Sequence, residues 1–293
     1  MNDNNFQRIC CAAACLAPLL LAGMVLLLGT GSWDAWRTFG WEFLVRGTWD
    51  PAREQFGAGN AMLGTLLTTG IAMLLAVPPA FLTAFYLNNA AEWVRRPLSL
   101  GLDLLAAIPS VIYGMWGLFV LAPVVQKYVQ PFLLSLPGLS RLPIWGTDRN
   151  GFGIFTAGLV LALMILPYIS AVMRDVFRMT PPLLVEAARG IGCTRWETAR
   201  DMVLRYGFRG MLGGVLLGLG RALGETMAVL FVVGNVMRTP GGLFDGGTTI
   251  AATLANHFAE ADGMLRSVLF ALGLVLLALT FAVQIPAYFY RSR

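Results

Sequence analysis

The chain is poor in the residues on which soluble enzymes rely. Charged residues make up only 13% of its 293 residues, and it has one histidine and four cysteines. Cys10, Cys11 and Cys15 share one apolar run and Cys193 lies far along the chain, so neither a disulfide framework nor a metal-ligand spacing is present. We therefore expect no metal and no cofactor.

Motifs of common catalytic sites are also missing. No phosphate loop of the Gly-x4-Gly-Lys-Ser/Thr type occurs, and His257 has no serine and aspartate at a spacing typical of a nucleophilic triad. The net charge of +5 is not accompanied by a segment in which basic and aromatic residues alternate. The sequence thus predicts neither an enzyme nor a nucleic-acid-binding protein.

Long apolar runs dominate what is present. Hydrophobic residues make up 57% of the chain, and a helix that crosses a bilayer needs roughly 20 of them. Six segments meet this requirement: Cys10–Thr30, Met62–Leu87, Ser99–Val125, Gly153–Met173, Met211–Gly234 and Ser267–Phe289. They predict an all-α integral membrane protein surrounded by lipid. The first run is about as long as a full span and no small-residue cleavage site follows it, so we expect it to be retained.

Basic residues are concentrated on alternate connecting loops. The fourth loop alone, from Arg174 to Arg209, holds seven arginines. Loops rich in Lys and Arg remain on the cytoplasmic side of a membrane. This distribution predicts that both termini and the fourth loop are cytoplasmic.

Local sequence signals predict two short helices in the fourth loop. Thr180 followed by Pro181 has the pattern of an N-cap with proline at the first helical position. That helix can end at Gly190 or Gly192, because glycine adopts the left-handed conformation that often follows a helix. Thr194 to Glu197 then has the spacing of a capping box, which predicts a second helix leading into the fifth span.

The fourth loop resembles the EAA loop of ABC-importer permeases. The residues that carry the resemblance are Glu186, Ala187, Ala188, Gly192 and Leu204. In that family the helix before the glycine docks in a groove of the ATPase subunit, so the resemblance implies that these residues form the ATPase-coupling loop. Both small alanines would permit close approach of that subunit. The alternative is a pair of surface helices with no partner.

Three longer segments narrow the resemblance. Ala107–Pro123, Met164–Ile169 together with Arg174–Phe177, and Gly218–Asn235 resemble the PstC-type permease subunits of phosphate-specific ABC importers. The resemblance implies a six-transmembrane-helix type I ABC importer permease bundle in the bacterial inner membrane. It further implies an N-terminal helix and external segment over residues 1–60, a permease core over 61–293, and the coupling loop at 174–210.

The same resemblance implies the partners. They are a PstA-like sister permease that completes a heterodimer, two copies of an ATP-binding subunit, a periplasmic phosphate-binding protein, and phosphate itself as the substrate. Two other functions stay open: a permease for another oxyanion, such as sulfate or molybdate, and a membrane docking or sensing subunit for an ATPase.

The fifth run contains glycines in two rows beside two charged residues. At about 100° per residue, Arg221 and Glu225 would lie on one helical face with Gly214 and Gly218, with Gly220 and Gly224 on a neighbouring stripe. Both glycine pairs have the GxxxG spacing that lets another helix approach closely. A charged side chain at mid-bilayer costs a few kcal/mol or more, so both charges should face protein or water.

Three interpretations of Arg221 and Glu225 are possible. They can form a structural ion pair one helical turn apart. Alternatively, Arg221 is a transient ligand for phosphate that Glu225 orients, since a guanidinium matches phosphate oxygens, and the family resemblance favours this. General acid or base chemistry lacks partner groups. Asp103 is a further intramembrane acid, which can line the pathway or pair with Arg95 or Arg96.

Overall fold

The protein is a mostly helical, multi-pass bundle. The computed structural model describes residues 3–136 and 143–292. Within these residues, six helical segments are long and apolar enough to cross a membrane: Cys10–Gly31, Gly59–Asn88, Ser110–Ser135, Ile154–Arg178, Thr198–Leu223 and Gly263–Ile285. The predicted helical class and number of candidate spans are confirmed. The predicted bounds of the third and fifth spans are wrong.

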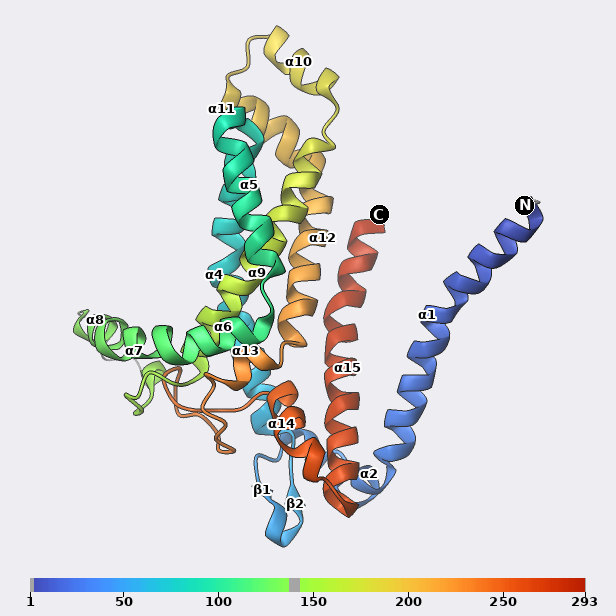
Figure 1. Ribbon diagram of the computed structural model, residues 1–293, viewed down its shortest axis with the longest axis vertical. Coiled ribbons are helices and arrows are strands. Elements are labelled where there is room, and N and C mark those ends of the chain that lie inside the picture. Colours follow the sequence, from blue (N-terminus) through green and yellow to red (C-terminus); the bar gives the residue numbers. More distant parts are fainter. Residues whose placement is uncertain (1–2, 137–142, 293) are drawn as a thin grey trace.

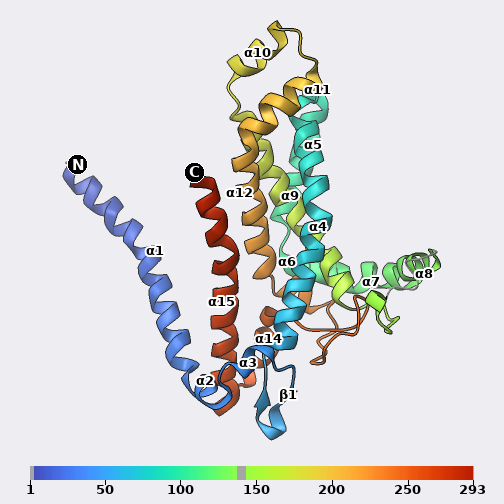
Figure 2. The ribbon, with the colours of Figure 1, turned by 180° about the vertical axis from the view of Figure 1, so that it is seen from behind.

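The long helices stand roughly upright between two ends of the molecule (Figure 1). They are α1 (Asp3–Gly31), α4 (Gly59–Asn89), α5 (Glu92–Ala107), α9 (Ile154–Arg178), α12 (Leu204–Leu223) and α15 (Gly263–Ser292). One end carries α10 (Pro182–Gly190) and α11 (Arg195–Glu197), and the other carries the hairpin of β1 (Trp49–Asp50) and β2 (Gln55–Phe56). We call them the α10 end and the hairpin end. The free ends of α1 and α15 both point toward the α10 end (Figures 1 and 2).

Shorter elements connect them. They are α2 (Trp33–Phe39), α3 (Glu42–Val45), η1 (Pro51–Arg53), α6 (Ser110–Trp116), η2 (Gly117–Leu121), α7 (Ala122–Val124), η3 (Val125–Val129), α8 (Gln130–Ser135), η5 (Pro143–Trp145), η6 (Thr198–Val203), α13 (Met227–Leu230), α14 (Ile250–His257) and η7 (Phe258–Glu260).

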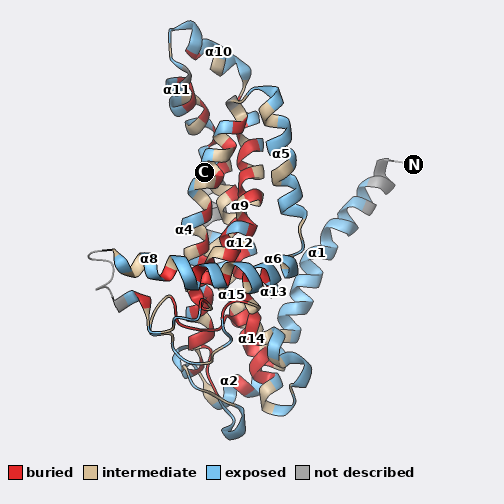
Figure 3. Cartoon of the chain, turned by 60° about the vertical axis from the view of Figure 1, so that its left-hand side comes forward, coloured by how far each residue is buried: buried red, intermediate tan, exposed pale blue. Residues whose placement is uncertain are grey.

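Helix α9 forms the centre of the bundle, and Figure 3 shows its buried residues along most of its length. Its closest neighbour is α4. A row of fully buried alanines at i, i+4 spacing, Ala72, Ala76, Ala80 and Ala84, lies on α4. Small residues at this spacing let two helices approach closely. Pro78 and Pro79 in α4 and Pro167 in α9 do not end their helices.

The predicted third span, Ser99–Val125, is not one helix. It breaks at Ile108 and Pro109, both of which have extended backbone torsions, because proline disfavours a helical conformation in the residue before it. The upright part is α5. The part from α6 to α8 runs crosswise to the bundle (Figures 1 and 3).

A second, smaller core lies at the hairpin end. Phe43 of α3 and Phe56 of β2 are fully buried there, with Ile250 of α14 and Leu269 and Leu272 of α15. This core joins the segment between α1 and α4 to the last helix. Helix α1 itself diverges from the bundle beyond its contact with α15 and α2 (Figure 2), so its apolar surface is left for lipid or another chain.

Candidate functional site

The fifth membrane-spanning helix ends between the two charged residues that the sequence places on one face. Helix α12 stops at Leu223, and Gly224 closes its last turn. The carboxylate Oε1 of Glu225 accepts a hydrogen bond from the backbone N–H of Ala228, at 3.3 Å, near the start of α13. An acid is favourable at a helix N-terminus. The prediction of one continuous helix over Met211–Gly234 is therefore wrong.

Arg221 is exposed on the surface of the single chain, and its contact is aromatic. Its guanidinium carbon lies 5.8 Å from the ring centre of Tyr168 in α9. No ion pair joins Arg221 to Glu225, both of which lie in the described part of the chain. The two residues thus do not neutralise each other, and the interpretation of a self-satisfied ion pair does not fit this structure.

The glycines of α12 lie against two different helices. A Cβ atom at Gly218 would come within 2.5 Å of the Ile169 side chain of α9, and one at Gly214 within 3.0 Å of Val172. A Cβ atom at Gly220 would meet the amide of Gln284 in α15, whereas Gly224 faces only its own helix. Gly214 and Gly218 thus permit the contact with α9, and Gly220 permits the contact with α15.

One stripe of α9 is left open between α5 and α12. Helices α4, α12 and α5 pack around α9, yet Leu163, Asp175 and Arg178 on α9 are exposed, and Tyr168 and Ala171 are half-buried. At 100° per residue these five residues share one side of the helix. We call this side the open face of α9. Arg221 reaches its α12 edge through Tyr168.

An ion pair between a buried arginine and an exposed aspartate lies at the other edge of the open face. The Nη2 of Arg174 in α9 donates to the Oδ1 of Asp103 in α5 at 3.2 Å. The Arg174 side chain is 10% exposed and that of Asp103 is 56% exposed. Arg95 and Arg96 instead pair with Glu92, so the predicted pairing of Asp103 with either of them is wrong.

Several buried polar atoms near this pair lack hydrogen-bond partners in the described structure. Arg174 Nε and Nη1 and Ser170 Oγ are buried and have no hydrogen-bond partner among the described residues. Ser170 is fully buried one helical turn before Arg174. The sequence analysis did not single out these two residues, because only the packing of α5 on α9 shows that Arg174 is buried.

The α10 end carries the predicted coupling loop, with one difference. Helix α10 begins at Pro182 rather than Pro181, and the hydroxyl of Thr180 is buried without a hydrogen-bond partner in the described structure. The predicted Thr180 N-cap is wrong. Pro182 forces an extended conformation on the residue before it, so the helix cannot include Pro181.

The rest of the loop follows the prediction. Helix α10 ends at Gly190, and Gly192 has a positive φ of 92°. Thr194 and Glu197 form the capping box: the Thr194 N–H donates to Glu197 Oε2 at 2.7 Å and the Glu197 N–H donates to Thr194 Oγ1 at 3.2 Å. The hydrogen bonds from the Thr194 backbone and hydroxyl lower the pKa of Glu197.

The two alanines of the loop differ in exposure. Glu186 and Ala187 are exposed, but Ala188 is 1% exposed and packs into its own chain, and Leu204 is packed against the bundle core. Only Ala187 of the two alanines can therefore offer close approach to a partner. Apolar side chains beside it are exposed, with Leu183 at 74% and Ile191 at 80%.

A cluster of aromatic rings joins this loop to the bundle. Trp196 of α11 lies edge-on to Phe85 of α4, with ring centres 6.0 Å apart. Phe85 contacts Phe177 of α9 at 6.2 Å, and Phe81 completes the cluster. A displacement of α11 would thus reach α4 directly and α9 through Phe85.

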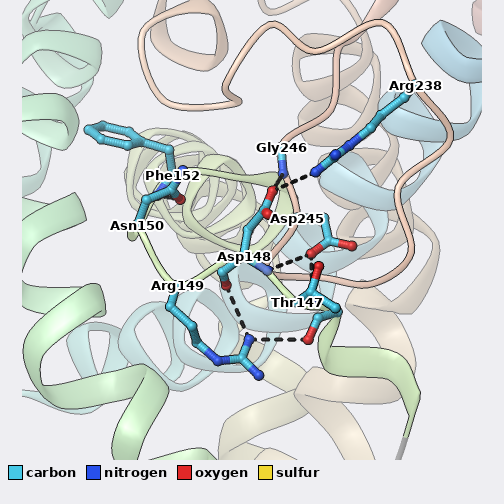
Figure 4. Close-up of polar contacts among 9 residues, drawn as sticks. Thr147, Asp148, Arg149, Asn150, Phe152, Arg238, Asp245 and Gly246 are labelled. Atoms are coloured by element: carbon cyan, nitrogen blue, oxygen red, sulfur yellow. Dashed lines mark hydrogen bonds and ion pairs between the residues drawn. The ribbon is translucent and has the colours of Figure 1, made fainter.

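At the hairpin end, two aspartates tie together two loops that the sequence analysis did not connect (Figure 4). Asp245 Oδ1 accepts hydrogen bonds from the N–H groups of Thr147 and Asp148 at 2.7 and 2.9 Å. Asp148 Oδ2 accepts from Arg238 at 2.9 Å. Burial raises the pKa of Asp245, but the backbone N–H donors and the Arg238 charge outweigh it and lower the pKa overall.

The fold as a whole matches solved ABC-importer permeases. A chain of a bacterial alginate ABC transporter superposes with a TM-score of 0.61 at 18% sequence identity, over 97% of this chain and 94% of that chain. A chain of the MetNI methionine ABC transporter gives 0.59 at 15% identity, over 79% and 93%. The chain thus has the membrane-domain fold of these ABC transporter chains.

Comparison of the sequence with known proteins identifies the family more narrowly than the fold does. Residues 76–293 match the family model of binding-protein-dependent transport system inner membrane components. The phosphate transport system permease protein PstC of Haemophilus influenzae is 47% identical over 97% of this chain and 91% of its own length. The PstC of Pasteurella multocida is 49% identical over 90% and 84%. The chain belongs to the PstC family of these permeases.

Proposed function

We propose that the chain is a membrane-spanning permease subunit of an ATP-driven phosphate importer. The observation that carries the proposal is Arg221, a charged side chain exposed on the single chain at the end of a membrane-spanning helix. Such a side chain is too costly to face lipid, so it must face water or another protein chain. The PstC relatives are named as phosphate transport permeases, so we take phosphate as the transported anion.

Arg221 is arranged to receive an oxyanion. Tyr168 contacts the guanidinium through its ring, and a cation–π contact of this kind holds the cation without consuming N–H donors. The planar fork of donors matches phosphate oxygens. Glu225 is turned toward the start of α13, so it leaves the charge of Arg221 available and orients the segment that follows it.

The partners follow from the surfaces that the single chain leaves uncovered. A PstA-like sister permease would cover the open face of α9 and close the pathway around Arg221. Two ATP-binding subunits would sit beneath the heterodimer, one against the exposed side of α10 around Ala187 and Leu183. A phosphate-binding protein would deliver its ligand at the hairpin end. This places the α10 end and both termini in the cytoplasm of a bacterial inner-membrane protein.

In this proposal transport proceeds by alternating access. ATP binding draws the two ATP-binding subunits together. This movement displaces α10 of this chain and α11, which follows it. The ring contact of Trp196 with Phe85 passes that displacement to α4, and the Phe85–Phe177 contact passes it to α9. The pathway then opens toward the hairpin end, and hydrolysis returns it to the cytoplasmic side. The ATP chemistry belongs to the separate subunits.

Import of another oxyanion and a purely sensing role are the alternatives, and the PstC relatives do not favour them. Both are tested by uptake of labelled phosphate, with unlabelled sulfate and arsenate as competitors, in cells that lack this gene and carry the wild type or Arg221→Gln. We expect the wild type to restore phosphate uptake, and arsenate but not sulfate to inhibit that uptake. In Arg221→Gln the uptake rate should fall by about tenfold or more, since a charged hydrogen bond contributes about 1.5–3 kcal/mol.

The matched control is Arg266→Gln. Arg266 is also exposed and also lies over an aromatic ring, that of Phe270, at 5.8 Å, but it stands at the first turn of α15 away from the open face. It should transport at the wild-type rate. Equal loss in both variants would assign Arg221 a general surface role, and a wild type that fails to restore phosphate uptake would refute phosphate as the substrate.

A further inference from the structure

A buried arginine lies between α5 and α9 with most of its hydrogen-bonding capacity unused. In the part of the chain that the structure describes, Nη2 is the one side-chain nitrogen of Arg174 with a partner, which is Asp103. Its Nε and Nη1 and the Oγ of Ser170, all shielded from solvent, lack partners among the described residues. A buried guanidinium needs hydrogen bonds as well as a counter-charge to offset its desolvation. These three atoms therefore indicate a ligand that the single chain does not supply.

The same place is open on one side. Asp103 is more than half exposed although it lies 11 residues into α5, about 16 Å along the helix axis at 1.5 Å per residue. It pairs with Arg174 of α9, a helix long and apolar enough to span a membrane, so we expect its carboxylate to face water or protein rather than lipid. Asp103 and Arg174 lie at the α5 edge of the open face of α9, opposite the edge that Arg221 occupies.

The two edges are offset along the pathway direction. Arg221 contacts Tyr168, and Arg174 lies six residues further along the same helix, which corresponds to about 9 Å toward the α10 end. An anion that leaves Arg221 in that direction thus next meets the Arg174 edge.

We propose that Arg174, Ser170 and Asp103 form a second oxyanion site, on the α10 side of Arg221, that accepts protonated oxyanions and rejects fully ionised ones. The proposal rests on the proposed function. Arg174 donates through Nε and Nη1, and Ser170 donates through its hydroxyl. Asp103 accepts a hydrogen bond from the P–OH group that phosphate retains at neutral pH.

The carboxylate gives the site its specificity. Sulfate carries no proton at neutral pH, so it has nothing to donate to Asp103 and is repelled by its charge. Discrimination by a like charge placed against the wrong ligand is a common device of specific sites. Arsenate, which keeps an As–OH group, should pass as phosphate does.

The test uses the assembled importer in proteoliposomes, with phosphate uptake measured at rising sulfate. In the wild type sulfate should not compete. Asp103→Asn removes the repulsion and supplies an amide donor, so the sulfate concentration that halves phosphate uptake should fall by about tenfold or more. The matched control is Asp262→Asn, an exposed acid just before α15 and away from the open face of α9; it should keep the wild-type preference.

Arg174 is tested by two variants. Arg174→Gln should lower phosphate uptake by about tenfold or more without admitting sulfate. Arg174→Lys keeps the charge and the assembly but not the fork of donors, so it should raise the half-saturating phosphate concentration. The pair has only a structural role, holding α5 against α9, if both variants lower the uptake rate but the specific readouts do not change. These readouts are the phosphate-to-sulfate preference in Asp103→Asn and the half-saturating phosphate concentration in Arg174→Lys. If Arg174→Gln transports normally, these atoms hold water alone.

Failure of the two proposals can be told apart. A wild-type importer that moves phosphate with unaltered selectivity in Asp103→Asn overturns only the second site. A wild-type importer that does not move phosphate overturns the proposed function, and the second site with it.

Discussion

Arg221 and Tyr168 lie on different helices, 53 residues apart, with the guanidinium carbon 5.8 Å from the centre of the tyrosine ring. The contact fixes the arginine at the edge of the open face of α9, and its N–H groups have no hydrogen-bond partner among the described residues. It also ties the end of α12 to the helix that the rest of the bundle surrounds. An arginine positioned in this way is available to an anion without having to break an ion pair first.

Tyr168→Leu should weaken anion binding by Arg221 while leaving assembly intact. A cation–π contact contributes about 1 kcal/mol at a partly exposed site, so the half-saturating phosphate concentration should rise about fivefold. Tyr168→Phe keeps the ring and is the control. An equal effect of both variants would assign the role to the hydroxyl group rather than to the ring.

Gly218→Ala should destabilise the bundle, because its new methyl group would meet Ile169 in α9 at 2.5 Å. Overpacking of this kind costs about 1–3 kcal/mol, which would lower the midpoint of thermal unfolding of the purified permease complex. Gly70→Ala in α4 is the matched control, because nothing lies within 4 Å of its added Cβ. There the better helix propensity of alanine should keep or raise stability. A Gly218→Ala variant as stable as the wild type would show that α9 and α12 can separate without cost.

The two alanines of α10 should respond differently to the same enlargement. Ala187→Phe places a ring on the exposed side of α10 and should abolish co-purification of the ATP-binding subunit with little change in the stability of the permease. Ala188→Phe forces a ring into the chain's own packing, where the alanine is 1% exposed, and should lower stability as well. Co-purification and thermal unfolding of both variants check this. Normal subunit binding by Ala187→Phe would exclude that side of α10 as the docking surface.

Acid should loosen the two loops that Asp245 joins. Its folded-state pKa is lowered, chiefly because the backbone N–H donors and Arg238 outweigh the effect of burial. A lowered pKa stabilises the folded state above the unfolded-state pKa, which is about 4, and this stabilisation is lost as the pH falls through the lower folded-state value. The protection of the Thr147 and Asp148 amides, which is their hydrogen-exchange rate corrected for intrinsic exchange at each pH, should therefore fall below about pH 4.

Asp245→Asn is the corresponding variant and should show fast exchange of these amides already at neutral pH. Asp262→Asn, an exposed acid near the start of α15, is the control and should exchange as the wild type does. Slow exchange at both amides in Asp245→Asn would mean that the loops are held by their backbone contacts alone.

Local patterns predicted the parts of the coupling loop that local chemistry controls. The capping box of Thr194 and Glu197 and the helix stop before Gly192 are both present, because each depends on residues within one turn of the chain. The N-cap at Thr180 failed for an equally local reason. Thr180 and Pro181 predicted a helix that begins at Pro181, but the next residue, Pro182, determines where the helix begins.

By itself the sequence determined the class of the protein. It contains apolar runs long enough to span a bilayer, and segments with turn and cap signals separate them. In lipid such a pattern specifies a helical membrane bundle. Tertiary structure decided which charges meet. The end of α12 between Arg221 and Glu225, the contact of Arg221 with Tyr168 and the pair of Asp103 with Arg174 depend on how α5 and α12 pack against α9. Spacing within one helix cannot specify such partners, because they come from distant segments and are selected by the close fit of whole helix faces.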